Sequence, residues 1–332
     1  MTNRWSGSCT GRKPGGKADA MPHKVAAVLL LAASGLMAQD LDVLRVQGNV
    51  YMIAGAGGNI AVQIGDLGVL VVDSGLPQNT DKVLAAIRKL SDKPIQYIID
   101  TGPHPDHIGG SATIRKAGVT ITGANVTGDI NDAAQGAQVI AHLNVLNRVS
   151  APSGKQAAMP EGAWPTDTYV SGQKEVYFNE EPVTAVYQPK ASTDGDSFVF
   201  FRRSDVVATG DIFVTTSYPW IDLENGGSIQ GELDALNNLL DITIPKHEEE
   251  GGTYVIPGRG RICDEYDVLE YRDMITIIRD RVQAAIKKGM TLEQVRNAGY
   301  TKDFDSRYSA KSGFGTADNF ISAVYKSLSG KK

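Results

Sequence analysis

The sequence predicts an α+β fold in which two central β-sheets lie face to face and helices cover both outer surfaces, an αββα four-layer sandwich. Two observations support this prediction. Short runs rich in β-branched residues, separated by Gly, Asn and Asp, occur twice along the chain. Each set of runs is followed by segments with helical periodicity. Each half therefore supplies one sheet and helices to cover it.

The first half begins with a run of short strands and continues with alternating helices and strands. The first strands are predicted at residues 43–47, 50–54, 60–64 and 69–73. The following elements are a helix over residues 78–90, a strand at 95–99, a helix over 111–117 and a strand at 119–121. The loop at 102–110 follows the carboxyl end of a buried strand, where functional sites commonly lie.

The second half repeats this order after a Pro-, Ser- and Gly-rich surface segment at residues 150–168. Its strands are predicted at residues 174–178, 183–187, 198–202, 206–209 and 254–256, with a helix near 233–240. From Asp264 onward an apolar stripe predicts a long helix, and a second helix is expected over residues 316–328. These last helices are expected to serve packing alone.

Composition and charge exclude several classes of protein. Of the 332 residues, 42% are hydrophobic and 21% are charged, which is typical of a globular chain. The formal net charge of −5 argues against a nucleic-acid partner, because such binding depends on clustered Lys and Arg. Cys9 and Cys263 are the only cysteines in the sequence.

The N-terminal segment is typical of an export signal. Lys24 supplies a positive start, residues 25–37 are almost entirely apolar, and Ala38 is a small residue suited to cleavage. The apolar stretch is shorter than the ~20 residues of a transmembrane helix. We therefore predict a signal peptide with an upstream extension at residues 1–38, one domain at 39–332, and a periplasmic or extracellular location. Met1 and Met21 both remain possible start sites. Cys9 leaves with the signal, so no intrachain disulfide is expected.

One loop concentrates the residues that could bind a metal. The segment Thr101-Gly102-Pro103-His104-Pro105-Asp106-His107-Ile108-Gly109-Gly110 contains two of the five histidines of the chain and one carboxylate. Neutral imidazole and carboxylate are good ligands for zinc, and a tight Gly/Pro loop can direct several of them to one point. A metal site is therefore expected at this loop.

The loop resembles the metallo-β-lactamase superfamily signature Thr-His-x-His-x-Asp-His-x-Gly-Gly, with Gly102 at the position of the first histidine. Two further segments are similar to family motifs in the same order. These are Val71-Val72-Asp73-Ser74-Gly75 and Ala208-Thr209-Gly210-Asp211. The resemblance extends over residues 40–264 and implies the αββα fold of that superfamily.

Two more ligand positions differ from the family pattern. Ser192 stands at the histidine position of a loop that resembles Gly-His-Thr-x-Gly-x-Ser, and Arg259 replaces the histidine of a Pro-Gly-His-Gly segment. Together with Gly102, three of the five expected histidine ligands are replaced. The resemblance leaves His104, Asp106, His107 and Asp211 as metal ligands, with Asp106 and Asp211 as the catalytic residues.

The resemblance implies a zinc-dependent hydrolase with a reduced metal site, holding one ion or none. Metal-bound hydroxide would attack an ester, thioester, lactone or amide carbonyl of a small-molecule substrate. The alternative is a metal-poor pseudoenzyme or binding protein on the same fold, in which Arg259 offsets the negative charge of Asp106 and Asp211.

Residues outside these motifs offer candidate substrate contacts. Tyr218 and Trp220 follow the Asp211 strand in a Pro- and Gly-containing loop, and His142 lies in an apolar run that could approach the cleft. The alternative for His142 is a structural histidine, and for the loop a packed surface segment. The sequence indicates neither a particular substrate nor an oligomeric state.

Overall fold

The computed structural model describes residues 41–120, 136–151, 158–247 and 251–330. The predicted signal peptide lies outside these residues and stays a prediction. The chain folds into two β-sheets with helices on both sides, so the predicted sandwich is confirmed. None of the helices in the described part of the chain combines the length and hydrophobicity needed to cross a membrane.

The first sheet has seven strands in sequence order, β1 to β7. The antiparallel strands are β1 (Asp42–Gln47), β2 (Val50–Ala54), β3 (Ile60–Gly65) and β4 (Gly68–Val72). The parallel strands that follow β4 are β5 (Ile95–Ile99), β6 (Gln138–His142) and β7 (Asp167–Tyr169). Because β4, β5 and β6 are parallel, their carboxyl ends and the loops that follow them meet at one edge of the sheet.

The second sheet has the order β12-β11-β10-β9-β8. Its strands are β8 (Gln173–Phe178), β9 (Glu181–Tyr187), β10 (Ser197–Phe201), β11 (Val206–Ala208) and β12 (Tyr254–Ile256). Only β12 runs parallel to its neighbour, β11, so the segments after these two strands leave the sheet on the same side. Those segments carry Asp211 and Arg259.

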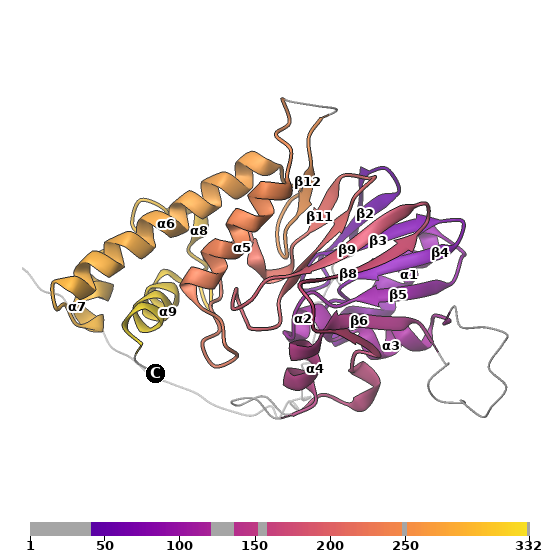
Figure 1. Ribbon diagram of the computed structural model, residues 1–332, viewed down its shortest axis with the longest axis horizontal. Coiled ribbons are helices and arrows are strands. Elements are labelled where there is room, and N and C mark those ends of the chain that lie inside the picture. Colours follow the sequence, from indigo (N-terminus) through magenta and orange to yellow (C-terminus); the bar gives the residue numbers. More distant parts are fainter. Residues whose placement is uncertain (1–40, 121–135, 152–157, 248–250, 331–332) are drawn as a thin grey trace, which may run out of the picture. The chain divides into compact units, whose positions relative to one another are not determined.

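Helices cover the outer face of each sheet (Figure 1). The first half contributes η1 (Pro77–Asn79), α1 (Thr80–Leu90), α2 (Pro105–Ile108), α3 (Ser111–Lys116) and α4 (Leu143–Val149). The second half contributes η3 (Gly210–Ile212), α5 (Ile229–Ile242), α6 (Glu265–Lys287), α7 (Leu292–Asn297), α8 (Asp305–Tyr308) and α9 (Ala317–Ser329). A short turn of helix, η2 (Glu161–Ala163), precedes β7.

Three apolar layers hold the sandwich together. The middle layer lies between the sheets and includes Leu70, Ile140, Phe178 and Phe201, all of them buried. An outer layer joins the first sheet to α1 and α3, and the largest layer joins the second sheet to α5, α6 and α9. The central strands β4 and β10 are buried on both faces, as expected for sheets covered on both sides, whereas the edge strands β1 and β8 are largely exposed.

One predicted strand is wrong, and the end of the predicted surface segment at residues 150–168 enters β7, which pairs with β6. Residues 119 and 120 do not form a strand, although the Val119 amide donates one hydrogen bond to the Ile95 carbonyl. The strand that pairs with β5 is β6, which ends at His142. The apolar run at residues 138–142 has the length of a strand and is buried on both faces, so it shows no alternation that would mark it.

Candidate metal site

The signature loop places its polar side chains on a single turn of helix after β5. His104 has an extended backbone and caps the N-terminus of α2, whose first residue is Pro105. Proline fits this first helical position because its missing N–H would have no partner there. Asp106 and His107 therefore lie in the first turn, and both side chains are buried.

Asp73 fixes the orientation of His107. It follows β4 with a left-handed backbone (φ 65°), and its Oδ2 lies 2.7 Å from His107 Nδ1. The Thr101 amide and hydroxyl also donate to Asp73. Because Nδ1 is engaged by this carboxylate, Nε2 is the nitrogen that faces Asp106 and Asp211.

Asp106, His107 and Asp211 form a cluster that could hold a metal ion. One donor atom from each lies within 4.8 Å of the others. His107 Nε2 is 3.3 Å from Asp211 Oδ2 and 3.9 Å from Asp106 Oδ2. This nitrogen is buried and makes no hydrogen bond of acceptable geometry with any residue that the structure describes. A buried imidazole nitrogen without a hydrogen bond, directed at two carboxylates, fits a divalent cation.

His104 lies beside this cluster and is held between two carboxylates. Its Nδ1 is 2.7 Å from Asp211 Oδ2, and its Nε2 is 3.2 Å from Asp222 Oδ2. Its ring stacks on Trp220 with centroids 3.8 Å apart. Burial lowers the pKa of the His104 imidazole, but the hydrogen bonds to Asp211 and Asp222 outweigh it and raise that pKa to about 9. Without a metal, His104 is therefore a cation between two anions.

Arg259 bridges the two carboxylates of the cluster. Its Nη1 donates to Asp211 Oδ1 over 3.0 Å, and its Nη2 contacts Asp106 Oδ2. Burial alone would raise the pKa of Asp211, but the charges of His107 and Arg259 hold that pKa well below its usual range. The guanidinium thus supplies a fixed positive charge next to the cluster.

The other two replaced positions offer no room for a further ligand. A Cβ added to Gly102 would lie 2.9 Å from Asp196 Oδ1, closer than such atoms approach. Ser192 is fully buried, and its hydroxyl donates to the Trp220 carbonyl over 2.6 Å. The structure therefore brings His104, Asp106, His107, Asp211 and Arg259 together, while Gly102 contributes packing and Ser192 contributes structural hydrogen bonds to the loop that carries Trp220 and Asp222.

A cavity of about 800 Å³ opens above this cluster, and we call it the site cavity. Asp106, Asp211 and Arg259 lie at its base, and the Arg259 side chain is 33% exposed. Its walls are mainly apolar and include Leu76, Pro105, Val214, Trp220, Ala310 and Phe314. The last two come from the segment between α8 and α9, so the C-terminal region does more than the packing role expected of it.

The two predicted substrate contacts occupy different surroundings. Tyr218 lies along the site cavity, but its side chain is fully buried and its hydroxyl donates to Asp305 over 2.9 Å. His142 is not among the residues lining the site cavity. It stacks on Tyr187 with centroids 3.7 Å apart, and its Nδ1 accepts the Asn144 amide at the start of α4. Burial lowers the pKa of His142.

Asp222 was not identified from the sequence, although its carboxylate contacts His104. Its Oδ1 accepts the backbone amides of Glu224 and Asn225, and its Oδ2 accepts the Asn225 side chain over 2.7 Å. These bonds fix the carboxylate that orients His104. The only sequence signal was its place two residues after Trp220, in the loop already considered for substrate contact.

Comparisons with known proteins agree with this fold. The sequence matches the metallo-beta-lactamase superfamily over residues 44–247, which is more than half of the chain. The chain belongs to this superfamily. A linear primary-alkylsulfatase from Pseudomonas sp. (strain ATCC 19151) is 25% identical over 307 residues, covering 79% of this chain and 54% of the relative. The chain thus spans about half the length of this curated relative.

Solved structures show the same fold. A stereoselective inverting sec-alkylsulfatase from Pseudomonas sp. matches with a TM-score of 0.58 and 15% identity, covering 86% of this chain and 50% of that one. A metallo-beta-lactamase from Pontibacter korlensis matches with a TM-score of 0.53 and 12% identity, covering 71% of this chain and 99% of that one. At these identities the likeness concerns the fold alone.

Proposed function

We propose that the chain is a metal-dependent hydrolase in which a single zinc ion is held by Asp106, His107 and Asp211. The observation that carries this proposal is His107 Nε2, a buried nitrogen that faces both carboxylates and has no hydrogen bond within the described part of the chain. Arg259 takes the place of a second cation, because its guanidinium contacts Asp106 Oδ2 and Asp211 Oδ1 and offsets the charge of both carboxylates.

Each residue of this site has a separate role. Zinc, when bound, supplies a Lewis acid and lowers the pKa of water toward ~7. Asp73 holds the His107 ring in place, and Asp222 does the same for His104. Arg259, one-third exposed at the base of the site cavity, can donate to negative charge that develops on a substrate oxygen.

The proposed substrate is a small molecule with an apolar body and one hydrolysable group. Polar residues lie at the base of the site cavity and apolar residues line its walls, so the reacting group would lie at Arg259 and the apolar body along Val214 and Phe314. Esters, thioesters, lactones and amides fit this description, and the named relatives add alkyl sulfate esters. Export to the periplasm or beyond is part of the same proposal.

A hydrolysis assay with controlled metal content tests this function. We expect activity on a panel of 4-nitrophenyl alkanoates, thioesters, lactones, amides and alkyl sulfates to disappear after chelation and to return with zinc. Asp211→Asn should abolish it, whereas Asp234→Asn, an exposed acid on α5, should leave it unchanged. Activity that survives chelation and Asp211→Asn would disprove the proposal.

The contacts of Arg259 also favour a second candidate, a metal-free binding protein. Its guanidinium contacts Asp106 and Asp211 directly, and in such a site it would stabilise the two acids without any metal. This candidate predicts a folded wild-type chain that hydrolyses nothing in the panel with or without zinc, and whose thermal stability does not change when zinc is added.

A further inference from the structure

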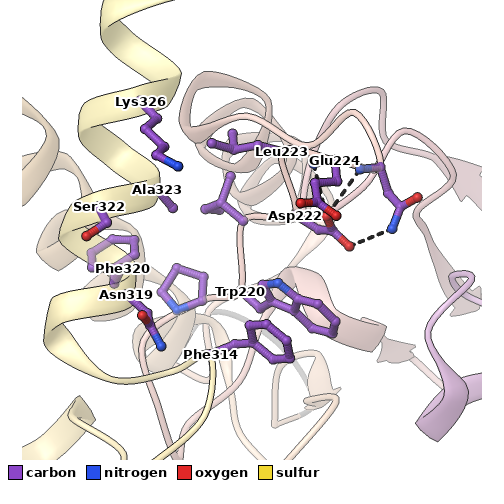
Figure 2. Close-up of a pocket in the computed structure, with 13 residues that line it drawn as sticks. Trp220, Asp222, Leu223, Glu224, Phe314, Asn319, Phe320, Ser322, Ala323 and Lys326 are labelled. Carbon is purple, nitrogen blue, oxygen red and sulfur yellow. Dashed lines mark hydrogen bonds between the residues drawn. The ribbon is translucent and has the colours of Figure 1, made fainter. Parts of the chain in front are cut away.

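A second pocket of about 550 Å³ lies beside the site cavity, between residues 219–225 and helix α9 (Figure 2). Trp220 and Phe314 border both spaces. Their rings stack with centroids 3.9 Å apart, and Phe314 is 58% exposed. The two aromatic side chains therefore form a wall between the site cavity and this pocket, which we call the second pocket.

The second pocket has an apolar part and a polar part. Leu223, Phe320, Ala323 and the two aromatic rings form the apolar part of its lining. Asn319, Ser322, Ala323 and Lys326 recur at the spacing of one helical face, so α9 presents this side to the pocket. The apolar surface can accept a hydrocarbon chain.

Charge is distributed unequally between the two sides of the second pocket. Figure 2 shows Lys326 on the α9 side and Asp222 and Glu224 on the opposite side. Asp222 is engaged by His104 and by backbone amides. Among the residues that the structure describes, no carboxylate pairs with Lys326, whereas Asn319 and Ser322 already donate to backbone carbonyls. Lys326 is thus the side chain on α9 that remains available to a ligand.

We propose that the second pocket binds a single-chain amphiphile with an anionic head, such as a medium-chain carboxylate. The head lies at Lys326, and the hydrocarbon chain lies along Leu223 and Ala323 toward the wall formed by Trp220 and Phe314. A negative head is favoured beside α9 because no carboxylate in the described part of the chain pairs with Lys326, whereas Glu224 on the opposite side of the pocket repels it. The site requires neither metal nor hydrolysis, so it stands apart from the proposed catalytic function.

Calorimetric titration of the chain with decanoate, below its micelle concentration, tests this proposal. We expect saturable binding that Lys326→Met weakens about fivefold, the size of an exposed charge pair, and that Lys326→Arg retains. Ser322→Phe, which places a ring in the pocket, should abolish binding. Lys287→Met removes an exposed lysine outside the pocket and should have no effect.

Decyltrimethylammonium and decanol distinguish the head group from the chain. Both should bind more weakly than decanoate. Lys326→Met should leave decanol binding unchanged and should not weaken binding of the cation, because it removes a like charge. The proposal is overturned if the cation binds as tightly as decanoate or if Lys326→Met behaves like Lys287→Met. It is also overturned if binding persists in Ser322→Phe and is lost in Arg259→Ala, because the ligand would then occupy the site cavity. Thermal melting of each variant confirms folding.

Discussion

Arg259 stands where the family pattern has a histidine, and its guanidinium reaches the two carboxylates that a second metal would share. Asp106 and Asp211 are both buried, so without a nearby cation their mutual repulsion would be costly. One arginine offsets that repulsion with a fixed charge that cannot dissociate. His107 Nε2 faces both carboxylates without a hydrogen bond to any described residue, and one ion fits among these three side chains.

At this scale we predict that Asp73→Asn weakens zinc binding by about 10- to 100-fold without unfolding the chain. The carboxylate that orients His107 would be lost, while asparagine still tolerates the left-handed backbone at this position. Competition with a zinc chelator of known affinity measures the change. Asp81→Asn, an exposed acid in α1, serves as the control. An unchanged zinc affinity in Asp73→Asn would show that His107 does not bind the ion.

The candidate ligands of the loop could be predicted from the sequence because they lie close together along the chain. His104, Asp106 and His107 lie within one turn, and the position of Asp211 follows from the end of a strand. The contact between Asp222 and His104 joins residues 118 positions apart, through a loop without periodicity. Such a contact depends on how the loop packs, which spacing does not specify.

At the scale of elements, α5 carries an acid that no local pattern explains. Glu232 is fully buried, and neither of its carboxyl oxygens has a hydrogen-bond partner in the described part of the chain. Burial raises the pKa of Glu232 well above its ordinary value of 4.5, and Asp196 and Asp211 add to the effect. The folded chain therefore holds this proton more tightly than the unfolded chain does.

The raised pKa of Glu232 in the folded chain leads to a prediction for Glu232→Met. A raised pKa in the folded state means that stability falls as pH rises above 4.5, and the variant removes that loss. We expect Glu232→Met to be about 1–3 kcal/mol more stable than wild type at pH 8, with the gain shrinking toward pH 4.5. Urea unfolding at several pH values measures it. A variant less stable than wild type at pH 8 would show that the carboxylate has a stabilising partner.

The elements themselves were predictable where periodicity or turn residues marked them. The four-strand meander, α1, α5, α6 and α9 follow from such patterns, whereas the short helices α7 and α8 were not predicted. β6 did not, because both its faces are buried. The sequence also did not predict that the segment between α8 and α9 lines the site cavity, because the contact of Phe314 with Trp220 depends on tertiary packing.

At the scale of the whole molecule, the site exists only because the two halves meet. Asn59, at the start of β3, donates its side-chain amide to the carbonyls of Pro257 and Gly260, and its backbone amide to that of Gly258. These bonds tie the first sheet to the segment that carries Arg259. The overall sandwich was predictable from the repeated order of strands and helices, but not these links between halves.

We therefore predict that Asn59→Ala lowers the free energy of unfolding by about 1–3 kcal/mol, because two carbonyls lose a donor. Urea unfolding measures this loss. Asn319→Ala, which removes an exposed amide on α9, should change stability by less than about 0.5 kcal/mol. Equal effects of the two substitutions would contradict the proposed link between the halves.

The metal content of the purified chain tests the central claim most directly. After zinc supplementation and dialysis, elemental mass spectrometry should find one zinc per chain, and Asp106→Ala should lose it while circular dichroism shows the fold retained. Arg259→His should keep at least that one ion. The account is contradicted if wild type holds no zinc and Arg259→His acquires it, because Arg259 would then replace the metal entirely.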